Sequence, residues 1–138
     1  MRINFIVNTN NRKIANLERK IKNLDVETIL SKTANNLIKE MQKTITTGTR
    51  SGNVYGNHQS SAPGEPPAHW HGGLFNSMIA TKKSSFEYEV SFTVPYAKDL
   101  ELGEGSISGN PRPFVQPSVD TIKKQFEKDI IDIFKRYV

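Results

Sequence analysis

The 138-residue sequence has no cysteine, a single tryptophan and no apolar run near the ~20 residues that a membrane-spanning helix needs. The lack of cysteine excludes disulfides, thiol catalysis and cysteine-based zinc sites, and it suits a cytosolic origin. No signal-peptide pattern follows Met1. The Ser-x-x-Lys, Gly-x-Ser-x-Gly, His-Glu-x-x-His and phosphate-loop patterns are missing as well. We therefore expect a protein that is not an enzyme, with no cofactor and no membrane segment.

Acidic side chains are scarce in the first third of the chain. Residues 1–50 hold ten Lys and Arg against four Asp and Glu (+6), residues 51–110 hold three against six (−3), and residues 111–138 hold six against four (+2). Segments of opposite charge suit head-to-tail contacts between identical copies.

The basic residues of the first third have two interpretations, a solvated helix face or a surface for loose contact with DNA. No helix-turn-helix, zinc-finger or aromatic RNA-binding signature accompanies them, so sequence-specific binding is not expected. The residues concerned are Arg12, Lys13, Arg19, Lys20, Lys22, Lys32, Lys39 and Lys43.

Hydrophobic periodicity in the first half of the chain predicts one strand and one long helix. Ile3, Phe5 and Val7 alternate with Arg2, Asn4 and Ile6, which indicates a short opening strand. Apolar residues three and four apart continue across 14–45 and predict an amphipathic helix, with a kink or a fresh start near Asp25. The helix should end at Thr46, Thr47 and Gly48.

The second half predicts a hairpin and a second helix. Alternation across 86–94 indicates a strand with one buried and one exposed face, paired with 74–79 through a polar turn at 82–85. A short helix or turn should follow at 96–102. Apolar spacing across 119–137 predicts a C-terminal helix with Pro117 in its first turn. The expected fold is one α+β domain: a small antiparallel β-sheet packed by a long N-terminal helix and a C-terminal helix, with extended loops at 48–73 and 103–113.

The run Ser61-Ala62-Pro63-Gly64-Glu65-Pro66-Pro67-Ala68 lies within the loop 48–73. Its three prolines fix φ and lack a backbone donor, which excludes a helix interior or a central strand. An irregular segment of this length in a small domain usually has a function. Composition alone is compatible with an ordinary proline-rich linker. The alternative is a stiff docking arm that loses little entropy when it binds a neighbouring subunit.

The same region offers the only metal candidates, which are His58, Glu65, His69 and His71. A His-x-His pair beside a carboxylate is compatible with zinc in principle. The surrounding prolines and glycines provide no rigid scaffold or second shell for such ligands. Trp70 between the histidines is more readily a packing anchor, so we expect no metal site.

Four segments resemble one known family when they are taken in order. They are Ser61-Ala62-Pro63-Gly64-Glu65-Pro66-Pro67-Ala68, Gly73-Leu74-Phe75-Asn76-Ser77-Met78, Pro95-Tyr96-Ala97-Lys98-Asp99-Leu100-Glu101-Leu102-Gly103 and Pro111-Arg112-Pro113-Phe114-Val115-Gln116-Pro117-Ser118-Val119. This order is similar to that of the tail-completion proteins of long-tailed bacteriophages, which join head to tail at the neck. In that family a threonine usually precedes the glycine of the second segment, whereas Gly72 stands there in this chain.

The resemblance implies a structural virion protein that catalyses no reaction. Several copies, six by family likeness, would form a homo-oligomeric ring between the portal–adaptor (head-closure) stack and the tail tube or its terminator. DNA would pass through the lumen, with non-specific contact at most, and assembly would take place in the host cytoplasm. A closely related alternative is the tail terminator itself, which caps the tube and also forms rings.

The residues expected to contact a neighbouring subunit or partner follow from these segments. Tyr96 suits either a half-buried seam or the edge of the sheet. Arg112 should pair with Glu101 or Glu104 of the same copy or the next one, and Phe114 suits either the core or an interface. The complete predicted set is Pro63, Glu65, Pro66, Pro67, Trp70, Tyr96, Glu101, Glu104, Arg112 and Phe114.

Overall fold

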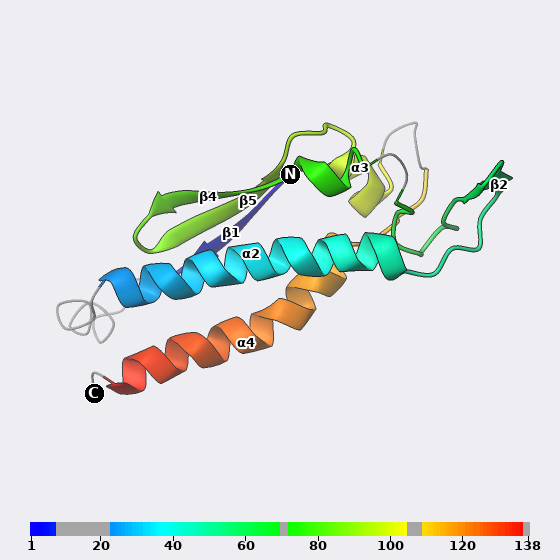
Figure 1. The fold of residues 1–138 in the computed structure, drawn as a ribbon. Coiled ribbons are helices and arrows are strands. Elements are labelled where there is room, and N and C mark those ends of the chain that lie inside the picture. Colours follow the sequence, from blue (N-terminus) through cyan, green and yellow to red (C-terminus); the bar gives the residue numbers. More distant parts are fainter. Residues whose placement is uncertain (8–22, 70–71, 105–108, 137–138) are drawn as a thin grey trace.

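A computed structural model describes residues 1–7, 23–69, 72–104 and 109–136. The chain forms two layers, a three-stranded sheet lying over a pair of long helices (Figure 1). This arrangement confirms the predicted α+β class. The first part of the predicted N-terminal helix, with Ile14, Leu17 and Ile21, lies outside the described residues, as do Arg12, Lys13, Arg19, Lys20, Lys22 and Tyr137.

The sheet has the strand order β1-β5-β4, and both pairings are antiparallel. Its strands are β1 (Arg2–Ile6), β4 (Met78–Ser84) and β5 (Glu87–Phe92). The hairpin was predicted correctly but its turn was not. Lys82, Lys83 and Ser84 belong to β4, and the turn lies at Ser85 and Phe86. The register shift between Lys82 and Ser84 explains the error, because an irregular strand end loses the period-two signal.

The second face of β5 is less exposed than the alternation predicted. Glu89 lies on the central strand and is only 7% exposed. Its carboxylate lies 3.7 Å from Arg2 on β1 and 3.8 Å from Lys83 on β4. Two flanking strands therefore cover a position that sequence alternation alone assigns to solvent.

Helix α2 (Asn23–Thr47) supplies the main apolar surface under the sheet. Its buried residues recur at spacings of three and four, which brings them to one side of a helix of 3.6 residues per turn. They are Val26, Leu30, Ala34, Leu37, Met41 and Ile45. The helix ends where the Gly48 N–H donates to the Thr44 carbonyl at 2.9 Å.

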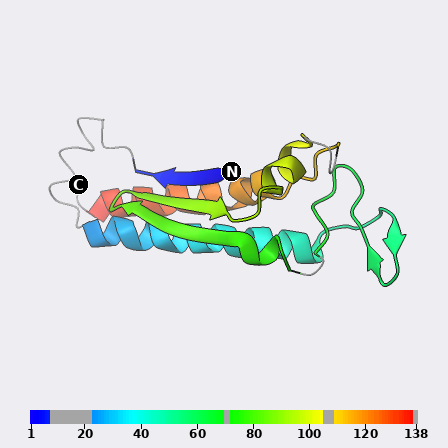
Figure 2. The ribbon, with the colours of Figure 1, turned by 90° about the horizontal axis from the view of Figure 1, so that it is seen from above.

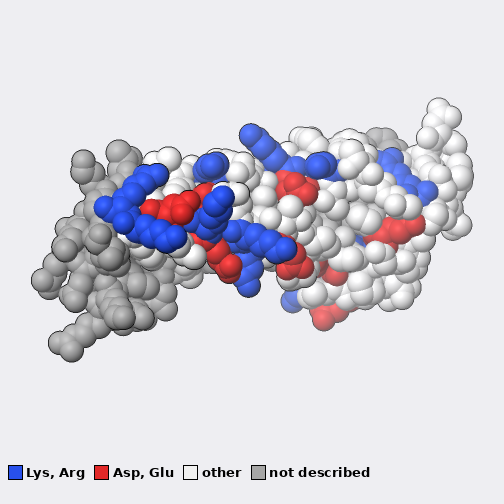
Figure 3. Space-filling view, turned by 90° about the horizontal axis from the view of Figure 1, so that it is seen from below, with Lys and Arg blue, Asp and Glu red and all other residues white. Residues whose placement is uncertain are grey.

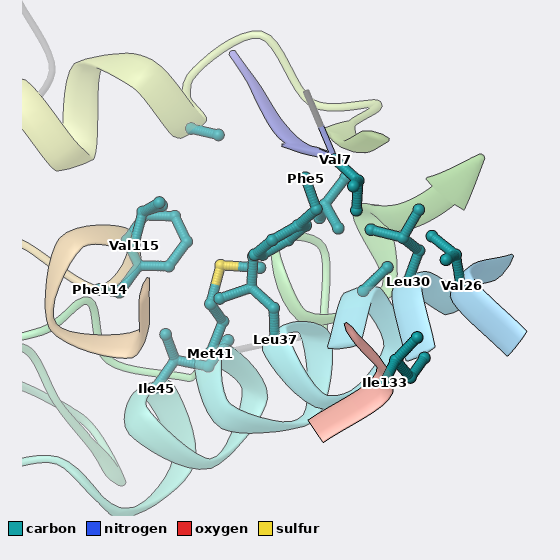
Figure 4. Close-up of a cluster of buried hydrophobic side chains, with 13 residues drawn as sticks. Phe5, Val7, Val26, Leu30, Leu37, Met41, Ile45, Phe114, Val115 and Ile133 are labelled. Atoms are coloured by element: carbon teal, nitrogen blue, oxygen red, sulfur yellow. The ribbon is translucent and has the colours of Figure 1, made fainter. Parts of the chain in front are cut away.

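Helix α4 (Val115–Arg136) runs beside α2 under the β1 side of the sheet (Figure 2). Phe5 of β1 packs edge-on against Phe126 of α4, with ring centroids 5.5 Å apart. The core in Figure 4 joins the α2 stripe to Phe5, Val7, Phe114, Val115 and Ile133. Pro117 lies in the first turn of α4, as predicted. No helix in the described part of the chain is long and apolar enough to cross a bilayer.

Shorter elements connect these layers at the end of the molecule where α2 ends. They are the 3-10 helix η1 (Phe75–Ser77), the short helix α3 (Ala97–Leu102) and a small hairpin of β2 (Val54–Tyr55) and β3 (His58–Gln59). The helix at 97–102 was predicted. The hairpin was not, and it projects away from the two layers (Figure 1).

Candidate functional site

The four segments that carry the family resemblance lie together at one end of the molecule. The Gly64 N–H donates to the Pro111 carbonyl at 2.8 Å, and the Arg112 N–H donates to the Leu100 carbonyl at 2.6 Å. The Thr93 N–H donates to the Ser77 carbonyl at 3.0 Å. We refer to the segments 61–68, 73–78, 95–103 and 111–119 as the motif cluster. Its parts are distant in sequence. Backbone hydrogen bonds join the segments 61–68, 95–103 and 111–119, and the segment 73–78 lies against Tyr96 through Gly73.

Glu101 holds the start of α4. Its carboxylate accepts the backbone N–H groups of Phe114, Val115 and Gln116 at 2.7, 2.9 and 2.9 Å. The first N–H groups of a helix have no partner within the helix and carry a partial positive charge, so an anion is favoured there. Glu101 therefore links α3 to α4. The predicted Glu101–Arg112 ion pair within one copy is wrong, because this carboxylate accepts from the start of α4.

Arg112 contacts the proline-rich run instead of an acidic residue. Its Nε donates to Ser61 Oγ at 3.1 Å, and Nη2 donates to the Ser61 carbonyl at 3.4 Å. Glu104 is exposed. No carboxylate among the described residues lies within 4 Å of the Arg112 guanidinium. The ion pairs of the described residues are formed by other cations, namely Arg2, Lys82, Lys83 and Lys123. Pairing of Arg112 with Glu104 of another copy remains a prediction.

The proline-rich run folds back on its own chain, and contact of its exposed part with a neighbouring subunit, as predicted for a docking arm, stays a prediction. Ser61 is 4% exposed and Pro67 is buried, while Pro63 is exposed. The Glu65 carboxylate links the run to Ser51. It accepts hydrogen bonds from Ala62 N at 2.8 Å, Ser51 N at 2.9 Å and Ser51 Oγ at 2.5 Å. These hydrogen bonds, first those of Ala62 and Ser51, hold the pKa of Glu65 below its usual range. A glutamate of the run itself thus satisfies the backbone N–H groups of Ser51 and Ala62, which therefore need no partner protein.

Gly72 and Gly73 determine the backbone conformation at the start of the second motif segment, 73–78. Gly72 has φ +77°, and a Cβ there would lie 2.8 Å from Asn76 Nδ2. A threonine would be strained in this conformation, which glycine adopts readily. A Cβ on Gly73 would lie 2.9 Å from the Tyr96 hydroxyl. Tyr96 is half-buried against this turn, so it belongs at least partly to the intramolecular packing.

Phe114 lies in the core. It is 0% exposed and packs edge-on against Phe92, with centroids 5.7 Å apart. Of the two alternatives predicted for Phe114, the core position is therefore confirmed, and its place in the set of contact residues is wrong. Trp70 and His71 lie outside the described residues. His69 stacks edge-on against Phe75 at 5.3 Å and donates its backbone N–H to the Ile45 carbonyl at 3.1 Å.

A cavity of about 480 Å³ lies between the hairpin and the motif cluster. Tyr55 and His58 of the hairpin line one part, and Tyr96 and Arg112 of the motif cluster line another. Apolar side chains contribute Ile45, Leu74, Phe75 and Leu100. None of the lining residues that the structure describes is acidic. The cavity is thus apolar in part and bordered by donors and cationic or titratable side chains.

A second hollow lies at the opposite end of the molecule, where β1 and α4 end (Figure 1). This apolar groove has a volume of about 310 Å³, and Glu127 is its one charged lining residue. Two of its residues, Ile6 and Ile131, are 54% and 51% exposed. Its other lining residues are Val7, Phe126, Ile130 and Phe134. We call it the β1–α4 groove.

On the helical side, the charges of the described residues are mixed in sign. Figure 3 shows Lys and Arg interspersed with Asp and Glu over this face. Lys123 and Glu127 pair along α4 at 3.9 Å. Exposed Lys32, Lys39 and Lys43 follow α2. A mixed distribution of this kind fits the solvated-face interpretation of these described lysines better than a DNA-binding stripe.

Sequence reasoning missed the hairpin and the groove. The hairpin had a usable signal, because Gly56-Asn57 between two short polar-apolar stretches favours a two-residue turn, and Gly56 has φ +61°. The groove had none, since it arises only where β1 meets α4.

No family model, curated protein or solved structure matches this chain.

Proposed function

We propose that this protein is a structural component of a phage neck, which assembles as a ring between the head adaptor and the tail. The observation that carries the proposal is the motif cluster. Four segments chosen on sequence resemblance alone lie together. Three of them are tied by hydrogen bonds, including the contact of Glu101 with α4 and that of Arg112 with Ser61, and the fourth lies against Tyr96. Such clustering is expected if the segments constitute one architectural unit rather than four chance matches.

The distribution of exposed apolar surface supports association between copies. Val54 and Tyr55 on the projecting hairpin are 66% and 55% exposed. Ile6 and Ile131 of the β1–α4 groove lie at the other end of the elongated chain. Surfaces at opposite ends cannot cover one another within one copy. Contacts between unlike surfaces of neighbouring copies form a closed ring when the rotation between them closes.

The proposed activity is mechanical. A ring of this kind would fix the tail to the DNA-filled head by complementary surfaces, with no bond made or broken. The motif cluster suits that task, because its loops are held by short intramolecular hydrogen bonds and lose little freedom when a partner docks on them.

The proposal is tested in a phage lysate that lacks the gene, viewed by negative-stain electron microscopy. Full heads and tails of normal length, both present but separate, are expected. Tails of uncontrolled length would instead indicate the terminator role, since an uncapped tube continues to grow. Intact particles would refute both roles.

A second test uses the purified protein alone and with its neck partners, with mass photometry as the readout. Ile131→Asp places a charge in the β1–α4 groove at an exposed position, so the fold should persist while ring formation is lost. Thr121→Asp, at an exposed position earlier in α4, is the matched control and should still assemble. Unchanged assembly of the Ile131→Asp variant would exclude the groove from the ring contact.

A further inference from the structure

The cavity between the hairpin and the motif cluster has an unusual electrostatic composition. Its described lining residues include Arg112, His69, Tyr55 and Tyr96, and none of them is a carboxylate. Among the acidic residues of the motif cluster, the Glu65 carboxylate accepts from Ala62 N and the Glu101 carboxylate accepts from the start of α4. Within the described part of the chain, the cavity therefore combines a guanidinium with hydroxyl groups and apolar side chains.

Arg112 retains hydrogen-bonding capacity toward an anionic acceptor. A guanidinium has five N–H donors, and Ser61 accepts two of them, one at a long 3.4 Å. The planar group is suited to bidentate binding of a carboxylate. The backbone at Arg112 is also held in place, because the Arg112 N–H donates to the Leu100 carbonyl. A carboxylate entering the cavity would thus meet an arginine that is already oriented.

The apolar part of the cavity adds a second requirement for an occupant. Ile45, Leu74, Phe75 and Leu100 line it together with Pro67 and Ala68. Burial of an aliphatic side chain against them would contribute free energy in proportion to the apolar area removed from water. A phosphate group or an isolated anion would leave this surface uncovered, whereas an acidic residue next to an aliphatic one would use both parts.

We propose that this cavity binds an extended acidic segment of a partner protein, in which a glutamate or aspartate is flanked by an aliphatic side chain. One wall is the hairpin, whose Tyr55 is 55% exposed, so the cavity is too open to enclose most of a small molecule as ligand pockets do. An open trough fits a segment of chain. That the segment comes from a head or tail protein rests on the proposed neck function; the binding itself does not.

The test uses full-length protein and two synthetic peptides, acetyl-Ser-Leu-Glu-Leu-Ser-amide and the same peptide with Gln in place of Glu. Binding is followed by the fluorescence of Trp70, the chain's single tryptophan, which is adjacent in sequence to the cavity residue His69. Amide chemical shifts locate the site. The Glu peptide should bind at least about tenfold more tightly than the Gln peptide, as expected for a charge-assisted hydrogen bond. Shifts should concentrate at Leu74, Leu100 and Arg112.

Variants separate recognition from folding. Arg112→Gln should abolish the preference for Glu over Gln in the peptide, while Arg136→Gln, an exposed arginine at the far end of α4, should keep it. Because Arg112 also bonds Ser61, Tyr55→Ser provides a second variant on the exposed hairpin. This variant should weaken the binding of both peptides, because it removes one wall of the cavity and leaves the motif cluster unchanged.

Several outcomes would overturn the inference. They are equal binding of the two peptides, no binding of either, shifts confined to the β1–α4 groove, or displacement of the Glu peptide by a tighter-binding DNA oligonucleotide. Mass photometry of the same samples keeps the two proposals distinguishable. Ring formation without peptide binding would leave the neck proposal standing, and peptide binding by a protein that never assembles would leave only the binding site.

Discussion

Removal of the Glu101 carboxylate is the perturbation for which the structure gives the most definite expectation. Three consecutive backbone N–H groups at the start of α4 donate to this side chain, at 2.7 to 2.9 Å. In Glu101→Gln the charge is lost and one acceptor oxygen is replaced by an NH₂ group that faces backbone donors. At least one N–H group would then lose its partner in a partly buried position.

The size of the effect follows from known helix-capping energies. Loss of an N-terminal cap costs about 0.5–2 kcal/mol, and loss of an anion at a helix N-terminus costs about 0.3–1 kcal/mol more. We expect Glu101→Gln to lower the free energy of unfolding by about 0.8–3 kcal/mol, the sum of the two contributions. For a chain of this size, this corresponds to a fall in Tm of roughly 3–12 °C.

Urea unfolding followed by far-ultraviolet circular dichroism measures the change. Glu104→Gln is the matched control, because this exposed glutamate lies three residues further on and has no hydrogen bond described for it. The control should differ from the wild type by less than about 0.5 kcal/mol. If Glu101→Gln is as mild as the control, the carboxylate does not hold α4 and the proposed link between α3 and α4 is wrong.

Three further predictions concern the same end of the molecule. Phe114→Ala should cost about 3–5 kcal/mol of unfolding free energy in urea, since the ring is wholly buried; a loss below about 1 kcal/mol would place it outside the core. Gly72→Thr should cost about 1–3 kcal/mol through its positive φ, with Gly72→Asn milder, and equal stabilities would contradict the assigned conformation. The lowered pKa of Glu65 contributes stability above the ordinary glutamate value of 4.5, and this contribution is lost as pH falls through the lowered pKa. The Tm of Glu65→Gln should therefore decrease less than the Tm of the wild type as the pH falls below that value. Parallel profiles of Tm against pH would show that folding does not lower the pKa of Glu65.

The corrected role of the prolines changes what their replacement should do. Pro67 is buried and Pro66 contacts the end of α2, where a Cβ on Gly48 would lie 3.0 Å from its Cγ. Glycine at these positions would remove packing and add freedom to the unfolded chain. Stability should fall together with assembly, in contrast to a free arm, for which only assembly would suffer.

The sequence by itself determined the elements with a strong local period. The apolar stripe from Val26 to Ile45 specifies α2, because residues three and four apart share one side of a helix whatever covers it. Pro117 near the start of α4 and the alternation along β5 are equally local. These signals fixed the α+β class without any knowledge of contacts.

Tertiary structure alone decided which groups meet. Glu101 and the N–H of Phe114 are 13 residues apart, and Arg112 and Ser61 are 51 apart. Periodicity records which face of an element is apolar but not which distant segment covers it. The burial of Glu89 between two strands and of Pro67 against its own chain depends on that pairing, as do the cavity and the β1–α4 groove.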